Sequence, residues 1–241
     1  LVLSSFIQVI DNMKISVDRM TNLMELLMPI LLTLLIVTSG PNAKIMFHPM
    51  VLGLVNIVGI IIKNLIFPLI IFSFILNKIE LNKLSDLSRK VIIFIITASF
   101  TIFIGFLTIY GLATKIDGLS IRTAKFAVDK FIPIVGSFLS DAVDTVISSA
   151  TILKNGMGIV GLVLLVIVIL SPLIKIVTIL FAYNLIGALV EPIVSKNISQ
   201  FFTDISKTLL MVLITMVSMG IMFFITITMI VDTGNSLLML R

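Results

Sequence analysis

Residues 156–190 read GMGIVGLVLLVIVILSPLIKIVTILFAYNLIGALV, a run whose only charged side chain is Lys175. A helix needs about 20 mainly apolar residues to cross the ~30 Å hydrocarbon core of a bilayer. The run exceeds that length, and Pro172 near its middle predicts a helix break. It therefore predicts either one long broken membrane span or two short ones.

The rest of the chain has the same character, with 59% hydrophobic and only 12% charged residues and a mean hydropathy of +1.27. Soluble domains have about 45–50% apolar and about 25% charged residues. We therefore predict an all-α polytopic membrane protein with about 5–7 transmembrane or re-entrant helices. The predicted parts are an amphipathic interfacial segment (1–22), a first membrane helix group (23–113), an amphipathic segment with a polar stripe (114–155), a second membrane helix group (156–231) and a short C-terminal tail (232–241).

The composition excludes several kinds of chemistry. The chain has no Cys and a single His, His48, and it lacks any Gly-Lys-Ser/Thr sequence. A thiolate or multi-His metal site, a Cys nucleophile and a P-loop are thereby ruled out. No acid–base or nucleophile arrangement is evident either, so we expect no catalytic site, no cofactor and no metal.

Two other patterns favour structural interpretations. The net charge of +5 is spread between hydrophobic runs, which is typical of cytoplasmic loops facing anionic lipid and not of nucleic-acid binding. The glycines of GMGIVG at 156–161 match a dinucleotide fingerprint, but that fingerprint requires a preceding strand, and here a helical pattern precedes it. We expect these glycines to permit a tight turn or close helix contact.

A charged residue lies at the centre of the apolar run 49–76. Lys63 and Asn64 occupy this position, and Pro68, a second candidate helix break, follows them. A lysine at the centre of a membrane helix costs about 2.5–3.5 kcal/mol on insertion scales. Either Lys63 faces a polar interior with a function, or the run folds back on itself or pairs Lys63 structurally.

Lys175 beside Pro172 resembles Lys63 beside Pro68. Matched broken helices mark the binding sites of many transporters. The order of Lys and Pro is reversed between the two runs, however, and the runs share no sequence similarity. We treat Lys63, Asn64 and Lys175 as candidates for a polar lining or docking surface.

The segment 114–155 contains a polar stripe. Pro133 and Gly136 divide the segment into two helical pieces, and the second piece, 137–155, alternates with helical spacing. Its polar side is formed by Ser137, Asp141, Asp144, Ser148, Thr151 and Asn155, and its apolar side by Phe138, Leu139, Ala142, Val143, Val146, Ala150 and Leu153. The stripe predicts either a helix that lines a water-filled path or a helix that lies on the membrane surface.

The same region resembles a known family. The region 125–161, which contains KFIPIVGSFLSDAVDTVISSATILKNGMGIVG, and the ending NSLLMLR are similar to the membrane-embedded C-terminal portion of the stage III sporulation protein AE family. The chain starts at Leu1 without a signal-peptide pattern, so we expect an N-terminal part to be missing. The residues that carry the resemblance are Lys125, Phe131, Pro133, Gly136, Asp141, Asp144 and Asn155.

The resemblance implies a protein of endospore-forming bacteria in the mother-cell membrane that surrounds the forespore. It also implies partners, namely the other proteins of the stage III A operon and a forespore membrane protein, and a role in a channel between the two cells. Two functions stay open: a permease or channel subunit whose polar residues face water, and a scaffold that recruits ring and ATPase components. We count membrane lipid and a possible homo-oligomer among the expected partners.

Overall fold

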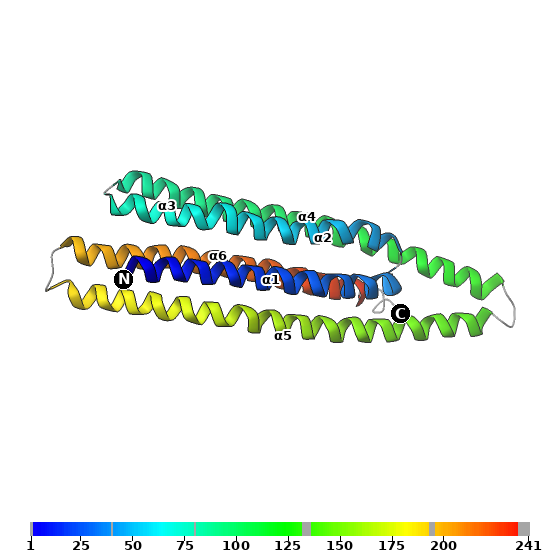
Figure 1. The fold of residues 1–241 in the computed structure, drawn as a ribbon. Coiled ribbons are helices and arrows are strands. Elements are labelled where there is room, and N and C mark those ends of the chain that lie inside the picture. Colours follow the sequence, from blue (N-terminus) through cyan, green and yellow to red (C-terminus); the bar gives the residue numbers. More distant parts are fainter. Residues whose placement is uncertain (1, 40, 80, 132–135, 193–195, 236–241) are drawn as a thin grey trace. The chain divides into compact units, whose positions relative to one another are not determined.

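The computed structural model describes residues 2–39, 41–79, 81–131, 136–192 and 196–235, with side chains described for 6–38, 51–79, 81, 83–109, 145–192 and 199–232. Over these residues the chain forms helices and no strand (Figure 1). The elements are α1 (Val2–Ser39), α2 (Pro41–Ile61), the π-helical turn η1 (Ile62–Ile66), α3 (Phe67–Lys78), α4 (Asn82–Phe131), α5 (Gly136–Val190) and α6 (Lys196–Asn235).

Among the described residues, five stretches are long and apolar enough to cross a membrane, which confirms the predicted class of fold. They are Phe6–Thr38, Val51–Lys78, Lys83–Ile109, Thr145–Val190 and Ser199–Asp232. The stretch around Lys63 passes from α2 through η1 into α3 without folding back. The predicted helix break at Pro172 is wrong, because α5 continues through this residue as one helix.

The two longest helices far exceed the length that a bilayer requires. α4 has 50 residues and α5 has 55. At 1.5 Å per residue these are lengths of about 75 and 80 Å, against a hydrocarbon core of about 30 Å. Each helix therefore has enough length to continue well past the membrane.

The described chain separates into two compact units, which we describe one at a time. The first unit contains Leu1–Asn22, Asn56–Thr101 and Val166–Ile221. Apolar side chains recur in it every three or four residues, so each helix buries one stripe. The buried stripes include Ile10, Met13, Val17 and Met20 of α1, Ile66, Phe67 and Ile70 around η1 and α3, and Ile205, Leu209, Val212 and Met216 of α6.

One end of the first unit is crossed by a set of aromatic rings that we call the aromatic layer. The ring centres are 4.7 Å apart for Phe6 and Phe74 and 6.1 Å apart for Phe74 and Phe201. Phe202 adjoins Phe201 and stacks at 6.2 Å on Tyr183. The layer thus joins α1, α3, α6 and α5 at one level near the α3–α4 turn.

The turn between α3 and α4 is fastened by two serines. Ser85 Oγ donates to the Ser73 carbonyl at 2.9 Å, and the two hydroxyls lie 3.1 Å apart. Both side chains are buried. Because a buried hydroxyl is costly without a partner, the pairing fixes the register of the two helices.

The second unit contains Leu23–Val55, Ile102–Leu165 and Met222–Arg241. Its core draws on Met24, Leu27, Met28 and Leu31 of α1, Phe103 and Leu107 of α4, and Met222, Phe223, Ile227 and Ile230 of α6. α1 thus runs as one helix through the predicted interfacial segment and the apolar run that follows it.

Of the long apolar helices, α4 and α5 are the least covered by the rest of the protein. In the most apolar window of α5, 22% of the residues are buried, against 50% in that of α6. Its exposed residues are mostly Ile, Leu, Val and Phe. A face of this kind suits contact with lipid or with another membrane helix.

Candidate functional site

An ion pair joins α1 to η1 within the candidate spans Phe6–Thr38 and Val51–Lys78. Lys63 Nζ donates to Asp18 Oδ1 at 2.5 Å. The exposed fraction of the side chain is 35% for Lys63 and 50% for Asp18. Lys63 is thus paired with a carboxylate from a different helix. Its side chain is still partly exposed.

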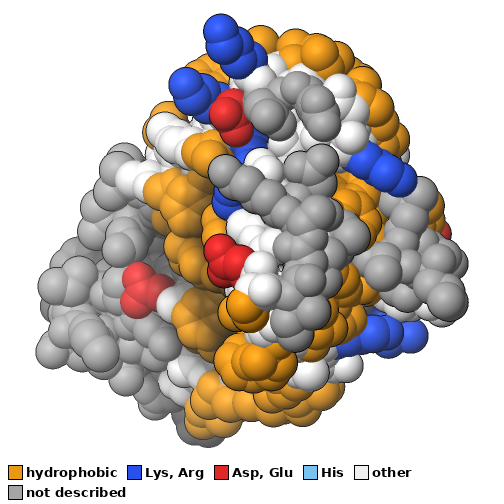
Figure 2. All heavy atoms as spheres, turned by 90° about the vertical axis from the view of Figure 1, so that its left-hand side faces the viewer, with side chains coloured by type: hydrophobic (Ala, Val, Ile, Leu, Met, Phe, Trp, Pro, Cys, Tyr) orange, Lys and Arg blue, Asp and Glu red, His pale blue; other side chains and the backbone are white. Residues whose placement is uncertain are grey.

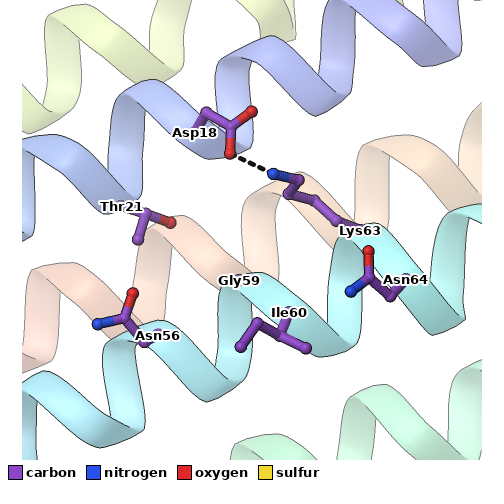
Figure 3. A pocket seen from close by; sticks show the side chains of 7 residues that line it. All are labelled: Asp18, Thr21, Asn56, Gly59, Ile60, Lys63 and Asn64. Carbon is purple, nitrogen blue, oxygen red and sulfur yellow. Dashed lines mark hydrogen bonds and ion pairs between the residues drawn. The ribbon is translucent and has the colours of Figure 1, made fainter.

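The ion pair borders a small polar pocket. Figure 3 shows Asp18 reaching from α1 to Lys63, and Thr21 of α1 near Gly59, with Asn56 and Asn64 on the facing helix. The pocket has a volume of about 120 Å³, and Gly59 and Ile60 complete its lining. That is room for several water molecules among donors and acceptors.

The π-helical turn has a clear cause in the sequence. Pro68 has no N–H, and its ring would clash with the carbonyl four residues earlier, that of Asn64. The backbone widens just before this point, and the Phe67 N–H bonds to the Ile62 carbonyl, five residues back. π-Helical turns of this kind often occur at functional sites. Pro68 was predicted to break the helix, and instead it shifts the helical register at Lys63.

The close approach of the two helices depends on Gly59. A Cβ at this position would lie 2.9 Å from Thr21 Oγ1. That hydroxyl oxygen is buried and has no hydrogen-bond partner among the described residues. Glycine therefore lets α1 come near enough for Asp18, one turn away, to reach Lys63.

Lys175 and Pro172 do not repeat this arrangement. Lys175 is exposed on α5, and Pro172 is buried inside a continuous α-helix. No ion pair to Lys175 is found in the part of the chain whose side chains are described. Only the Lys63 run has a π-helical turn, so the two runs are not structural counterparts.

The polar stripe is visible only in part. Asp141 and Asp144 lie on α5, but their side chains fall outside the described residues, as does Pro133, while Gly136 is the first residue of α5. Of the remaining stripe residues, Thr151 is buried, and Ser148 and Asn155 are half-buried. Val146, Ile152 and Leu153 are exposed, with fractions of 58%, 72% and 59%. Over 145–155 the polar side includes buried positions and the large apolar side chains point outward, as in a helix that lies in lipid.

The inward face of α5 in the second unit also contains a lysine that sequence reasoning missed. Lys154 is fully buried, and its Nζ has no hydrogen-bond partner among the described residues. The Asn155 Oδ1 atom beside it is buried and unpartnered in the same sense. Asp232 of α6 is the carboxylate that offsets the lysine charge.

The glycines of the GMGIVG sequence serve close helix contact, as predicted. A Cβ at Gly158 would strike Val231 of α6, and a Cβ at Gly161 would lie 2.9 Å from Leu27 of α1. Gly156 has open space around it. Two of the three glycines thus allow α5 to approach its neighbours in the second unit.

A second charged cluster lies near the α3–α4 turn of the first unit. Arg89 has a side chain that is only 15% exposed, and its Nη1 lies 3.8 Å from Asp86. Its Nε and Nη2 atoms are buried without a hydrogen-bond partner in the described part. Asp204 of α6 interacts electrostatically with Arg89 and with Lys207, whose Nζ lies 4.0 Å away. Figure 2 looks onto this end and shows Lys and Arg side chains among hydrophobic surface.

These features define a polytopic α-helical membrane protein with a paired charge and a polar pocket inside its apolar spans. The model of the stage III sporulation protein AE family matches residues 1–234, and the chain belongs to this family. It is similar to stage III sporulation protein AE from Bacillus subtilis (strain 168), with 33% identity over 249 residues. The match covers 100% of this chain and 62% of that relative. No solved structure matches the chain.

Proposed function

We propose that this sporulation protein is a channel or permease subunit of a complex that connects the mother cell and the forespore. The observation that carries the proposal is the pocket at Asp18 and Lys63. Ionisable residues in membrane spans are rare and tend to mark substrate or ion pathways. Here the ion pair is half exposed and lies beside a pocket with room for several water molecules.

The chemistry of the pocket suggests what it would accept. Asp18 and Lys63 compensate each other, so the lining is strongly polar and carries no net charge. Asn56 and Asn64 add amide donors and acceptors, and Thr21 adds a hydroxyl. Such a lining forms hydrogen bonds with water and small polar molecules, and it does not favour ions of one sign.

The setting of the complex is part of the proposal. We place the protein in the mother-cell membrane around the forespore, together with other proteins of the stage III A operon and a forespore membrane partner. We assign it no catalytic reaction of its own, so any energy from nucleotide hydrolysis comes from a partner. The chain spans about 62% of its curated relative, and the activity of the whole protein is included in this proposal.

Two observations favour the alternative, a scaffold that recruits ring and ATPase components. The charges of Lys63 and Asp18 are satisfied inside the fold, as a purely structural pair would be. The thinly covered α5 also offers a long apolar surface for a partner. The two functions differ in whether water reaches the pocket.

Thiol labelling distinguishes the two functions, and the absence of Cys makes it direct. The experiment places single cysteines at Asn56 and Asn64, with Leu65 as the matched control because it is exposed but lies outside the pocket lining. The channel role predicts that a membrane-impermeant thiol reagent labels the two pocket positions in intact cells and not Leu65. Unlabelled pocket cysteines, in variants that still produce heat-resistant spores, would support the scaffold instead.

A further inference from the structure

Among the described side chains of α5, one exposed residue is charged, namely Lys175 in the middle of a long apolar stretch. Lys175 is exposed, with the exposed hydroxyl residues Ser171 and Thr178 one turn away on the helix surface. The exposed apolar residues Ile174 and Val177 adjoin it along the chain, with exposed fractions of 57% and 49%. No carboxylate of the same unit pairs with it among the described side chains. An unpaired lysine on an apolar face requires either water or a partner.

Contacts within the first unit fix the depth of Lys175. A Cβ at Gly187 would meet Phe202 at 3.3 Å, and a Cβ at Gly220 would meet Ile169 at 2.8 Å. The two contacts lie eighteen residues apart on each helix, so α5 and α6 keep one register between them. Because Phe202 belongs to the aromatic layer, Gly187 marks the level of that layer on α5.

Counting from the aromatic layer places three charged residues at one level. Asp18 lies twelve residues from Phe6, and Lys175 lies twelve residues from Gly187. Lys63 lies eleven residues from Phe74. The helices of this unit run nearly parallel or antiparallel in Figure 1, so each distance is about 18 Å along the helix axes.

That depth is too great for Lys175 to escape along its own helix. Lys207 of α6 lies five residues from Phe202, and Lys175 of α5 lies twelve residues from Gly187 at the same level. Lys175 is therefore seven residues, or about 10 Å, farther from the aromatic layer than Lys207. A lysine side chain is shorter than that gap, so snorkelling does not bring its ammonium group to the level of Lys207. The charge must be met at its own depth.

Asp18 is the acidic residue of this unit that lies at the same depth. Among the described carboxylates, Asp11 and Asp204 are within about five residues of the aromatic layer. The Asp18 side chain is half exposed, and its recorded partner, Lys63, uses only Oδ1. A carboxylate accepts several hydrogen bonds, so Asp18 has capacity for a second ammonium group.

We infer that the exposed face of α5 packs against a second copy of this chain, with Lys175 bound to Asp18 of the neighbouring copy. When copies are related by rotation about the membrane normal, residues that touch across the interface lie at equal depths. Lys175 and Asp18 lie at equal distances from the aromatic layer, as such a contact requires. The two residues lie on different helices, so the contact is heterologous and its repetition generates a ring if the rotation closes. The shared charges would link each copy to the next through the polar pocket.

Cysteine cross-linking in membranes of the full-length protein tests this contact. Two differently tagged copies are co-expressed, one with Ile15→Cys and one with Thr178→Cys, exposed positions that lie one turn from Asp18 and at the same depth on α5. We expect a cross-linked product that requires both tags. The matched control is Leu185→Cys in place of Thr178→Cys, because Leu185 lies on the same side of α5 but two turns away, and it should cross-link much less.

The charge dependence provides a second criterion. Lys175→Gln should lower the yield of the product by about 3- to 30-fold, the range for one polar contact between membrane helices, and Lys175→Arg should retain it. Three results would overturn the inference: cross-linking of Thr178→Cys mainly to itself, labelling of Thr178→Cys by an impermeant reagent without cross-linking, or neither product nor labelling. The assay needs no transport, so its outcome is independent of the proposed channel function.

Discussion

Asp18 and Lys63 meet across forty-five residues of sequence, at the place where α1 passes the only π-helical turn among the described elements. Neither residue is fully buried, and the pair lies on the border of a pocket. The pair therefore serves both as a link between helices and as part of a polar surface, and its two roles are experimentally separable.

Replacing Asp18 by Asn should lower the free energy of unfolding by about 1 kcal/mol, because Lys63 then lacks a counter-charge and because polar contacts between membrane helices are modest. In a Lys63→Met background the same change should have much less effect. Unfolding by SDS in mixed micelles measures the cycle. Asp11→Asn is the control, since Asp11 is 60% exposed and pairs with Lys14 within one helix. Equal effects of Asp18→Asn in both backgrounds would contradict the coupling.

Gly59→Ala should destabilise the fold by about 1 kcal/mol or more, because the new methyl group meets Thr21 Oγ1 at 2.9 Å. Thr21→Ala should restore most of the loss by removing that oxygen. Gly53→Ala is the control, as nothing lies within 4 Å of a Cβ there. The same unfolding assay applies, and a Gly59→Ala loss that Thr21→Ala leaves unchanged would disprove the contact.

Pro68→Ala should convert the π-helical turn into regular α-helix, because the new N–H can bond to the Asn64 carbonyl. The side chain of Lys63 would then point in a different direction relative to α3, and the Asp18–Lys63 coupling energy should fall toward zero. The double-mutant cycle measured in the Pro68→Ala background tests this. Pro172→Ala, in a helix that is already regular, should leave the coupling intact.

Lys154→Met should leave the free energy of unfolding unchanged or raise it by about 1 kcal/mol. The reason is that an apolar chain replaces a buried ammonium group that has no hydrogen-bond partner in the described part of the protein. Asp232→Asn should act in the opposite direction, since it removes the charge that offsets Lys154. Lys207→Met, at a side chain that is 56% exposed, should change stability by less than about 0.5 kcal/mol. Spore counts test whether Lys154 has a function. A Lys154→Met protein that is stable but no longer supports sporulation would show that the lysine is needed for function.

Replacing both Asp141 and Asp144 by Ala should abolish sporulation while membrane insertion stays normal, if the stripe forms a polar lining or a docking surface. Heat-resistant spore counts and membrane fractionation provide the two readouts. Asp129→Ala, on the preceding helix, is the control and should be tolerated. Full sporulation without the two carboxylates would rule the stripe out.

The class of fold could be predicted from the sequence because length and apolarity alone determine what crosses a membrane. Lys63 stood out for the same reason, as a charge inside an apolar run. Its partner did not, because Asp18 lies in a segment whose mixed composition resembled an interfacial helix. Only the packing of α1 against the η1 region brings the two charges together.

The remaining differences have local physical causes. The effect of a proline on a long helix depends on whether neighbouring backbone groups can adjust, so Pro68 produced a π-helical turn and Pro172 none. Lys154 was missed because it falls between the polar and apolar sides of the predicted stripe, while in the structure it faces inward with Ala150 and Gly158. Periodicity places residues around a helix but does not show which side its neighbours cover.

The distance along the chain between Asp18 and Lys63 has a consequence for biosynthesis. At about 5–20 residues per second, a ribosome needs roughly 2–9 s to add the forty-five residues that separate the two. During that interval Asp18 has been made and its counter-charge has not. The contact that links α1 to η1 therefore forms only after the later hydrophobic segment has been made.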